Sequence, residues 1–259
     1  MRCFATGWGS KDYLGGERAA MIAQSASEKV DNTPQDAQVV KPHIKIQADG
    51  PYLVTGSPKL VRRIRVKNAQ GESAAWEAGE DYPAQPPTFK LCRCGRSKDM
   101  PFCDDSHEGS PWDNAPKADH APSETRRQFF EGVGIILTDD ETLCAGFGFC
   151  DRFGGVWEEI KQTGDTEIRK QLKAQIGLCP SGRLQYLRKK GAEPEEVEYE
   201  PMIAVIPDGP LWVLGGIPVE TPDGFVFEAR NRQLLCRCGQ SKNKPFCDGT
   251  HWDIKFKAP

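Results

Sequence analysis

The sequence of 259 residues has no long hydrophobic run, no excess of basic charge and no familiar catalytic motif, and each absence excludes a class of protein. Nowhere do about 18 or more apolar residues follow one another, so the sequence predicts no membrane-spanning helix and no membrane partner. Its 37 acidic residues outnumber 34 lysines and arginines, and the net charge of −3 lacks the basic excess typical of nucleic-acid-binding proteins. Because a paired nucleophile and base and a phosphate-binding loop are also missing, we expect no enzymatic activity.

The N-terminal region has no continuous apolar segment of the kind found in secretory signal peptides. Asp12 and Glu17, together with few arginines, also argue against an organellar transit peptide. Residues 25–41 are polar and contain proline, so residues 1–42 are predicted to form a mobile leader. The expected location is the reducing interior of a cell. The cytoplasm is favoured, and an organelle is the alternative.

Ten cysteines carry most of the information in the sequence. An even number of cysteines in a small secreted protein indicates disulfide bonds. Here the cysteines are grouped in short loops, several as Cys-x-Cys pairs whose members bridge poorly to each other, and a secretion signal is missing. Metal binding is therefore favoured over five disulfides.

Six of these cysteines belong to an internal repeat. LCRCGRSKDMPFCDDSH, at residues 91–107, matches LCRCGQSKNKPFCDGTH, at residues 235–251. Each copy follows an Asp-Gly-Pro turn and a run of apolar, aromatic and β-branched residues, at 48–58 and 207–218, which predicts strands. The first copy has an additional insert, at 68–87. The repeat predicts two small β-rich units that pack as a pseudo-two-fold pair.

Each copy contains three thiols and one imidazole, a four-ligand set that suits zinc or an iron–sulfur cluster. Alternate residues of an extended Cys-x-Cys segment point to the same side and can bind one metal ion, whereas zinc sites more often use Cys-x2-4-Cys. Asp104 and Asp248 are predicted to cap short helices that carry the histidines towards the metal. The predicted ligands are Cys92, Cys94, Cys103 and His107 in the first copy, and Cys236, Cys238, Cys247 and His251 in the second.

The second loop resembles the signature of the CDGSH (mitoNEET-type) iron–sulfur family, Cys-x-Cys-x2-Ser-x3-Pro-x-Cys-Asp-Gly-(Ser/Thr)-His, at every specified position from Cys236 to His251. The first loop matches except at Asp105, where the family has glycine; aspartate tolerates a positive φ there better than most residues. The resemblance implies a [2Fe–2S] cluster held by three cysteines and one histidine in each loop. It also implies a reduction potential between those of all-cysteine and two-histidine clusters.

A third cysteine group lies between the copies. Cys144 and Cys150 occupy the first and third positions of a Cys-x2-Cys-x2-Cys run, Phe147 stands at the second, and Cys179 begins a Cys-Pro-Ser-Gly sequence. Ile168, Leu172 and Ile176 have the spacing of an amphipathic helix, with Asp165 as its N-cap and Gly177 at its C-terminal side. Strands are expected at 133–138 and 184–187. These cysteines are either ordinary buried residues or ligands of a [3Fe–4S] or [4Fe–4S] cluster. The segment resembles divergent single-cluster ferredoxin domains, which favours the cluster.

The predicted fold is α+β: two β-rich CDGSH-type units with a ferredoxin-like α+β insert. The predicted domains are a leader at 1–42, the first CDGSH unit at 43–120, the insert at 121–195 and the second CDGSH unit at 196–259. We expect electron transfer or a redox relay through two [2Fe–2S] clusters and one [3Fe–4S] or [4Fe–4S] cluster.

The alternative functions are cluster storage or transfer, or redox or pH sensing through solvent-facing histidine ligands whose protonation loosens the clusters. A purely structural zinc protein is a further alternative. Expected partners are redox proteins or cluster-accepting apo-proteins, not nucleic acid, and the chain is expected to be a monomer with an internal pseudo-dimer.

Overall fold

The two sequence copies fold into matching sets of four strands. The computed structural model describes residues 40–109 and 111–259, so most of the predicted leader lies outside the described residues. The first copy forms β1 (His43–Ile46), β2 (Tyr52–Thr55), β3 (Lys59–Lys67) and β5 (Thr88–Leu91). The second copy forms β9 (Met202–Val205), β10 (Leu211–Leu214), β11 (Val219–Glu220) and β12 (Arg232–Leu235). The predicted strands after the Asp-Gly-Pro turns are therefore confirmed.

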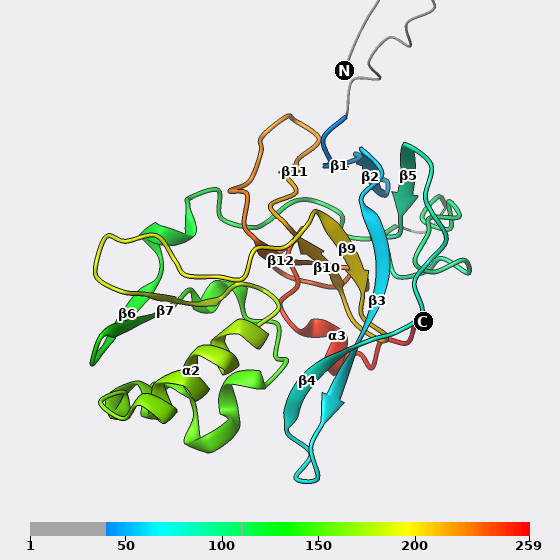
Figure 1. Cartoon of the computed structure of the whole chain (residues 1–259). Helices are drawn as coiled ribbons and strands as arrows, with labels where there is room; N and C mark the ends of the chain where they lie inside the picture. Colours follow the sequence, from blue (N-terminus) through cyan, green and yellow to red (C-terminus); the bar gives the residue numbers. More distant parts are fainter. Residues whose placement is uncertain (1–39, 110) are drawn as a thin grey trace, which may run out of the picture. The chain divides into compact units, whose positions relative to one another are not determined.

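Each copy gives its third strand to the sheet of the other copy (Figure 1). One sheet has the order β11-β1-β2-β5, and the other has the order β12-β10-β9-β3-β4. The exchanged strands pair in parallel at equivalent positions, Ile44 with Val219 and Leu60 with Ile203. This exchange joins the copies into the predicted pseudo-two-fold pair.

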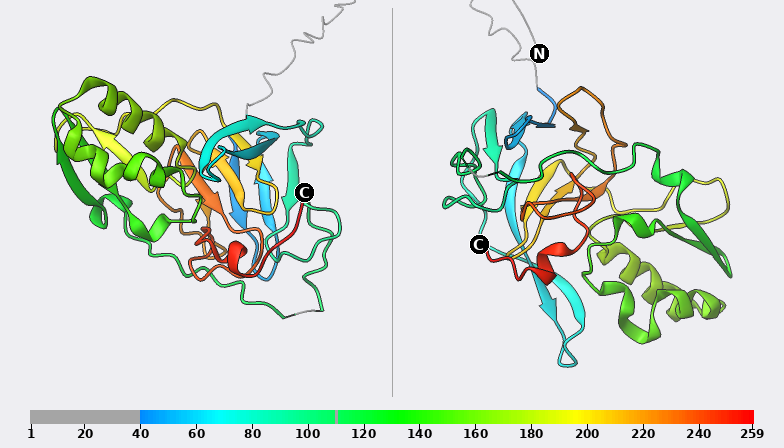
Figure 2. Two further views of the ribbon diagram at one scale, coloured as in Figure 1. Left: turned by 90° about the horizontal axis from the view of Figure 1, so that it is seen from below. Right: turned by 180° about the vertical axis from the view of Figure 1, so that it is seen from behind.

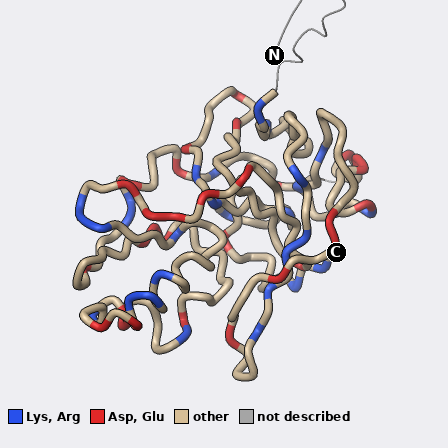
Figure 3. The backbone as a smooth tube through the Cα atoms, in the orientation of Figure 1, with Lys and Arg blue, Asp and Glu red and all other residues tan. Residues whose placement is uncertain are grey.

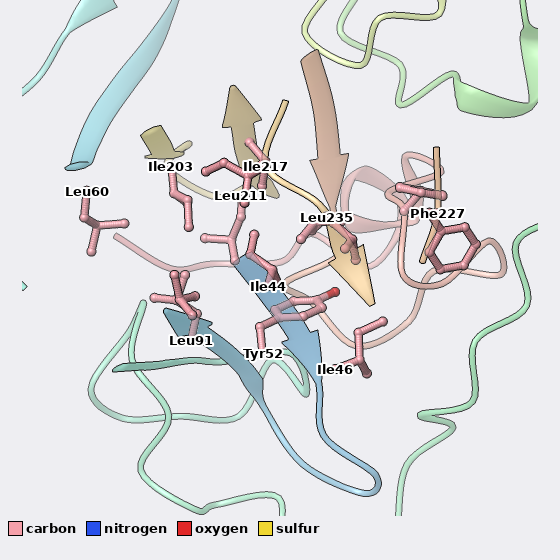
Figure 4. Packing of buried hydrophobic residues seen from close by; sticks show 14 of the residues in the cluster. Ile44, Ile46, Tyr52, Leu60, Leu91, Ile203, Leu211, Ile217, Phe227 and Leu235 are labelled. Atoms are coloured by element: carbon pink, nitrogen blue, oxygen red, sulfur yellow. The ribbon is translucent and has the colours of Figure 1, made fainter. Parts of the chain in front are cut away.

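The main hydrophobic core lies between the strands of the two copies (Figure 4). Both copies contribute fully or almost fully buried side chains, among them Ile44, Tyr52, Leu91, Ile203, Leu211 and Leu235. Burying one such aliphatic or aromatic side chain contributes about 1.5–3 kcal/mol. Because one core is shared, neither copy has a complete core of its own.

The middle segment forms an α+β unit beside the paired sheets (Figure 2). It contains a sheet of order β6-β7-β8, with β6 (Gln128–Gly132), β7 (Ile135–Asp139) and β8 (Leu184–Leu187). The helices are α1 (Val156–Glu159) and α2 (Thr166–Leu178), with short 3-10 turns at 123–125, 141–143, 149–154 and 160–162.

The predicted helix of the middle segment is confirmed. Asp165 caps α2 by accepting a hydrogen bond from Glu167 N at 2.7 Å. Leu172 and Ile176 of α2 pack with Ile135 of β7. The strand expected at 133–138 lies at 135–139, and β6 before it was not predicted.

The additional insert of the first copy attaches the middle segment to the paired sheets. It carries β4 (Ser73–Ala78), which pairs with the far end of β3. Trp76 Nε1 donates a hydrogen bond to Leu178 O at 3.0 Å, and Ser73 Oγ donates one to Phe147 O at 2.5 Å. The β3–β4 hairpin therefore holds the loop that carries the middle cysteines.

Two smaller features complete the described part of the chain. The residues around Phe225 and Phe227 form no strand and make one isolated bridge, from Val226 to Glu220. The last helix is α3 (Thr250–Asp253). None of the helices in the described ranges combines the length and the apolar character needed to cross a membrane.

Candidate iron–sulfur sites

The Cys-x-Cys pairs follow directly after β5 and β12, which end at Leu91 and Leu235. The extended backbone places both sulfurs of each pair on one side. The Sγ atoms are 3.6 Å apart for Cys92 and Cys94, and 3.7 Å apart for Cys236 and Cys238. Metal–sulfur bonds of about 2.3 Å at tetrahedral angles place two sulfurs about 3.7 Å apart. Each pair therefore fits one tetrahedral metal ion.

The third cysteine and the histidine of each loop form a second pair. The Sγ-to-Nδ1 distance is 3.5 Å from Cys103 to His107 and 3.3 Å from Cys247 to His251, near the distance of about 3.6 Å expected around one tetrahedral ion. A single metal ion needs three or more ligand atoms close together. Within the described ranges, one group of His, Cys, Asp or Glu side chains has three ligand atoms within 4.8 Å of one another. It consists of Cys103, Asp105 and His107. The four predicted ligands of each loop are thus arranged as two pairs rather than around a single point.

The aspartate after the third cysteine ties the loop together instead of capping a helix. Asp104 accepts hydrogen bonds from Lys98 N at 2.8 Å and Ser106 N at 3.0 Å, and Asp248 accepts the equivalent pair. The hydrogen bond from Lys98 N lowers the pKa of Asp104. The predicted N-caps are wrong, because α3 is capped at Gly249 and residues 106–109 form a turn rather than a helix. The two loops also share a cis peptide bond before proline.

A buried arginine between the two cysteines of each pair was not singled out from the sequence. Arg237 donates hydrogen bonds to Gly209 O at 2.9 Å and Ile206 O at 2.8 Å. Arg93 bonds the equivalent turn of the first copy. Burial lowers the pKa of Arg237 to about 10, which keeps it charged at neutral pH. The signal was present in the sequence: both copies read Cys-Arg-Cys.

The two ligand loops touch at the pseudo-two-fold axis through glycines. A Cβ atom on Gly95 would lie 2.4 Å from Cys238 O, and one on Gly239 would lie 2.4 Å from Cys94 O. Both glycines also have positive φ. A larger residue is therefore disfavoured both by the close backbone contact and by the left-handed conformation. The backbones of the two inner cysteine pairs are therefore in direct contact.

The two histidines lie in different surroundings. His107 is half-exposed beside hollows of about 570 and 380 Å³. His251 is 2% exposed, with the rings of Trp252 and Phe147 centred 4.3 and 5.9 Å away. Burial lowers the pKa of His251 to about 4. The expectation of a solvent-facing histidine thus applies to His107 and is wrong for His251.

The second residue after the third cysteine also differs between the loops. Asp105 has φ of +62° and Gly249 has φ of +89°, which confirms that this position needs a left-handed backbone. Asp105 Oδ1 lies 3.7 Å from Cys103 Sγ. The first loop therefore carries an exposed carboxylate beside a predicted ligand, where the second loop carries none.

The three middle cysteines line one pocket, together with residues 145–149 and Ser181. Burial raises the pKa of Cys150 to about 12, so its thiolate needs a cation such as cluster iron. Phe147 packs against Trp76 and Trp252, with ring centres 5.5 Å from each. The structure brings Cys144, Cys150 and Cys179 together with aromatic packing at the position of the missing cysteine.

The middle cysteine loop also packs on the second CDGSH loop. Trp252 Nε1 donates a hydrogen bond to Ala145 O at 3.0 Å, and Asn243 Nδ2 donates one to Thr142 O at 2.9 Å. A Cβ atom on Gly249 would lie 3.3 Å from the carbonyl of Ala145. The ligand loops are consequently in contact in the order first, second, middle.

Two protein families match parts of this chain. The family described as iron-binding zinc finger, CDGSH type, matches residues 49–108 and 208–252, and the family described as divergent 4Fe-4S mono-cluster matches residues 130–189. Neither the search of curated proteins nor that of solved structures gave a match. The chain is an iron–sulfur-binding protein. More particularly, it carries two CDGSH segments that flank a divergent single-cluster segment.

Proposed function

We propose that this protein passes single electrons between redox partners through two [2Fe–2S] clusters and one [3Fe–4S] or [4Fe–4S] cluster. The observation that carries the proposal is the serial contact of the three ligand loops: Gly95 against Cys238 and Gly249 against Ala145. Because electron tunnelling falls steeply with distance, loops in van der Waals contact suit transfer from one site to the next.

The residues of the chain prepare the sites for this role. Bound iron–sulfur clusters supply reversible one-electron chemistry. Arg93 and Arg237 place buried positive charge near cysteines of both loops, which favours the extra electron. Phe147 and Trp252 cover His251 and exclude water from the second loop.

The burial pattern gives the relay two accessible ends. Cys247 and His251 of the second loop are buried, whereas Cys103 and His107 of the first loop and all three middle cysteines are half-exposed. The second loop therefore holds the buried, intermediate site of the relay. Partners exchange electrons at the first loop and at the middle segment, and one chain suffices for the relay.

The test is a stepwise anaerobic reductive titration of the purified protein, followed by iron and zinc analysis and electron paramagnetic resonance. We expect iron without zinc, reduction of both CDGSH sites, and magnetic interaction between reduced sites in neighbouring loops. An oxidised [3Fe–4S] cluster is paramagnetic whereas an oxidised [2Fe–2S] cluster is silent, so the spectrum before reduction identifies the middle cluster. Failure of both CDGSH sites to accept an electron would end the relay proposal.

A second candidate function, cluster transfer to an apo-protein, is favoured by the half-exposed His107. An exposed ligand is open to exchange, whereas His251 is closed in by aromatic rings. Transfer to an apo-ferredoxin, followed by circular dichroism, should then empty the first loop only. Replacement His107→Cys should stop the transfer, and unchanged transfer from that variant would exclude this function.

A further inference from the structure

The second loop contacts the middle segment through three positions. Asn243 donates a hydrogen bond to Thr142 O, and Gly249 packs on Ala145. Trp252 donates a hydrogen bond to Ala145 O and meets the ring of Phe147 edge-on. Together these contacts cover the face of the second loop that carries His251.

The same three positions of the first loop all carry exposed carboxylates. Aligning the repeats places Asp99 opposite Asn243, Asp105 opposite Gly249, and Glu108 opposite Trp252. The middle segment packs on the second loop, whereas these three side chains of the first loop are exposed in the described structure. Figure 3 shows acidic positions gathered in this loop, which lies past β5 in the view of Figure 1.

Acidic charge is in excess over the whole of this face. The exposed acidic residues are Asp49, Asp99, Asp104, Asp105 and Glu108, and the exposed basic residues are Lys90, Arg96 and Lys98. Lys90 Nζ lies 3.9 Å from Asp105 Oδ1. The two hollows beside His107, of about 570 and 380 Å³, are lined by Asp49, Asp105 and Glu108 among others. The open face therefore has net negative charge and an irregular, recessed surface.

Asp105 holds its place at a conformational cost. Its φ of +62° lies in the left-handed region, which glycine adopts freely and aspartate does not. It also puts a carboxylate 3.7 Å from Cys103 Sγ, where a thiolate ligand would be repelled. Asp105 therefore destabilises both the backbone of the loop and the thiolate form of Cys103. An interaction of its charge with a partner outside the loop would explain its presence.

We propose that this face of the first loop, defined by Asp99, Asp105 and Glu108, docks an electron-transfer protein with a basic surface. The partner covers His107 as the middle segment covers His251. The inference rests on the proposed relay and names the kind of partner at its first end. Complementary charge would raise the rate of encounter and make that rate fall with salt.

The test measures how fast the loaded, pre-reduced protein gives one electron to each of two acceptors, the ferric haem of basic cytochrome c and the cupric centre of acidic plastocyanin. We compare wild type with Asp99→Asn/Asp105→Asn/Glu108→Gln. The matched control, Glu131→Gln/Glu158→Gln/Glu167→Gln, makes the same change in net charge at exposed positions of the middle segment. Absorption spectra and reduction potentials of all three proteins check that the sites are intact.

We expect the docking variant to lose at least about fivefold in second-order rate with cytochrome c at low salt, and to lose most of the salt dependence. The control should behave as wild type with cytochrome c. The docking proposal would be overturned if the variant and wild type had equal rates and salt slopes with cytochrome c. It would also be overturned if wild type reduced plastocyanin faster than cytochrome c. Either result would leave the relay proposal intact. An unreducible wild type would instead count against the relay itself.

Discussion

Single residues separate two loops that are otherwise alike. Eight predicted ligands follow from spacing, because Cys-x-Cys in extended backbone and the third cysteine with its histidine form close pairs in both copies. The difference in burial between His107 and His251 did not follow from spacing. It depends on which loop the middle segment covers, and the contacts that Gly249 and Trp252 make with Ala145 could not be foreseen from the sequence.

Asp105→Gly should stabilise the protein, because glycine relieves the left-handed strain at φ of +62°. A gain of about 1 kcal/mol would raise the thermal midpoint of the loaded protein by roughly 2–4 °C. The matched control Gly249→Asp should lower it, since a Cβ there meets the Ala145 carbonyl at 3.3 Å. Midpoints that move in the opposite directions, measured at one scan rate, would contradict this account.

Acid should remove the cluster of the first loop before that of the second. Burial disfavours the imidazolium form and lowers the pKa of His251 to about 4, so protons displace metal from His251 only at lower pH than from an accessible histidine. Visible absorbance followed from pH 7.5 downwards should fall in two phases. The variant His107→Cys should lose the early phase, and His251→Cys should keep it. If His251→Cys lost the early phase and His107→Cys kept it, the exposure of the histidine ligand would not determine the order of cluster loss in acid.

At the scale of elements, local pattern predicted what local energetics determine. The Asp165 cap and the spacing of Leu172 and Ile176 identified α2, and alternation after the Asp-Gly-Pro turns identified the lead-in strands. The role of β4 escaped the sequence, since an insert of ordinary composition gives no sign of what it packs against. In the structure Trp76 packs within 5.0 Å of Phe149 and 4.9 Å of Trp212, between the middle segment and the second copy.

Trp76→Ala should loosen the middle segment and empty its cluster first. Loss of this indole removes contacts with Phe147 and Phe149 and its bond to Leu178 O, at a cost of about 3 kcal/mol. Iron analysis should show the loss of the middle complement, with both CDGSH spectra kept. In Trp112→Ala, which removes an indole over Arg93 in the first copy, the middle site should stay loaded. Equal loss of iron from the middle site in the two variants would show that the β3–β4 hairpin does not hold the middle segment in place.

At the scale of the whole molecule, strand exchange decides how the copies depend on each other. The repeat predicted a pair but could not predict exchange, because the strand sequences are similar and either copy offers β3 or β11 an acceptable neighbour. The parallel registers of β3 with β9 and of β1 with β11 show that both third strands cross. Each sheet is therefore incomplete without the other copy.

The predicted second CDGSH unit, residues 196–259, should not fold as a monomer when produced alone. Its sheet lacks the strand that β3 provides, and Leu211 and Leu235 would lose the facing half of their core. Sedimentation should find an unfolded chain or a concentration-dependent homodimer, and added fragment 43–120 should restore a folded complex. A folded, metal-loaded monomer at micromolar concentration would refute this dependence.

The contact of Gly95 with Cys238 and of Gly239 with Cys94 has an evolutionary consequence. In a dimer of identical chains every substitution appears at both sites, so an advantage at one is tied to any harm at the other. Here both halves of the symmetric contact belong to one polypeptide, and mutation can alter one half alone. Asp105 and Gly249 differ in this one-sided way, while Gly95 and Gly239 at the axis are the same in both loops.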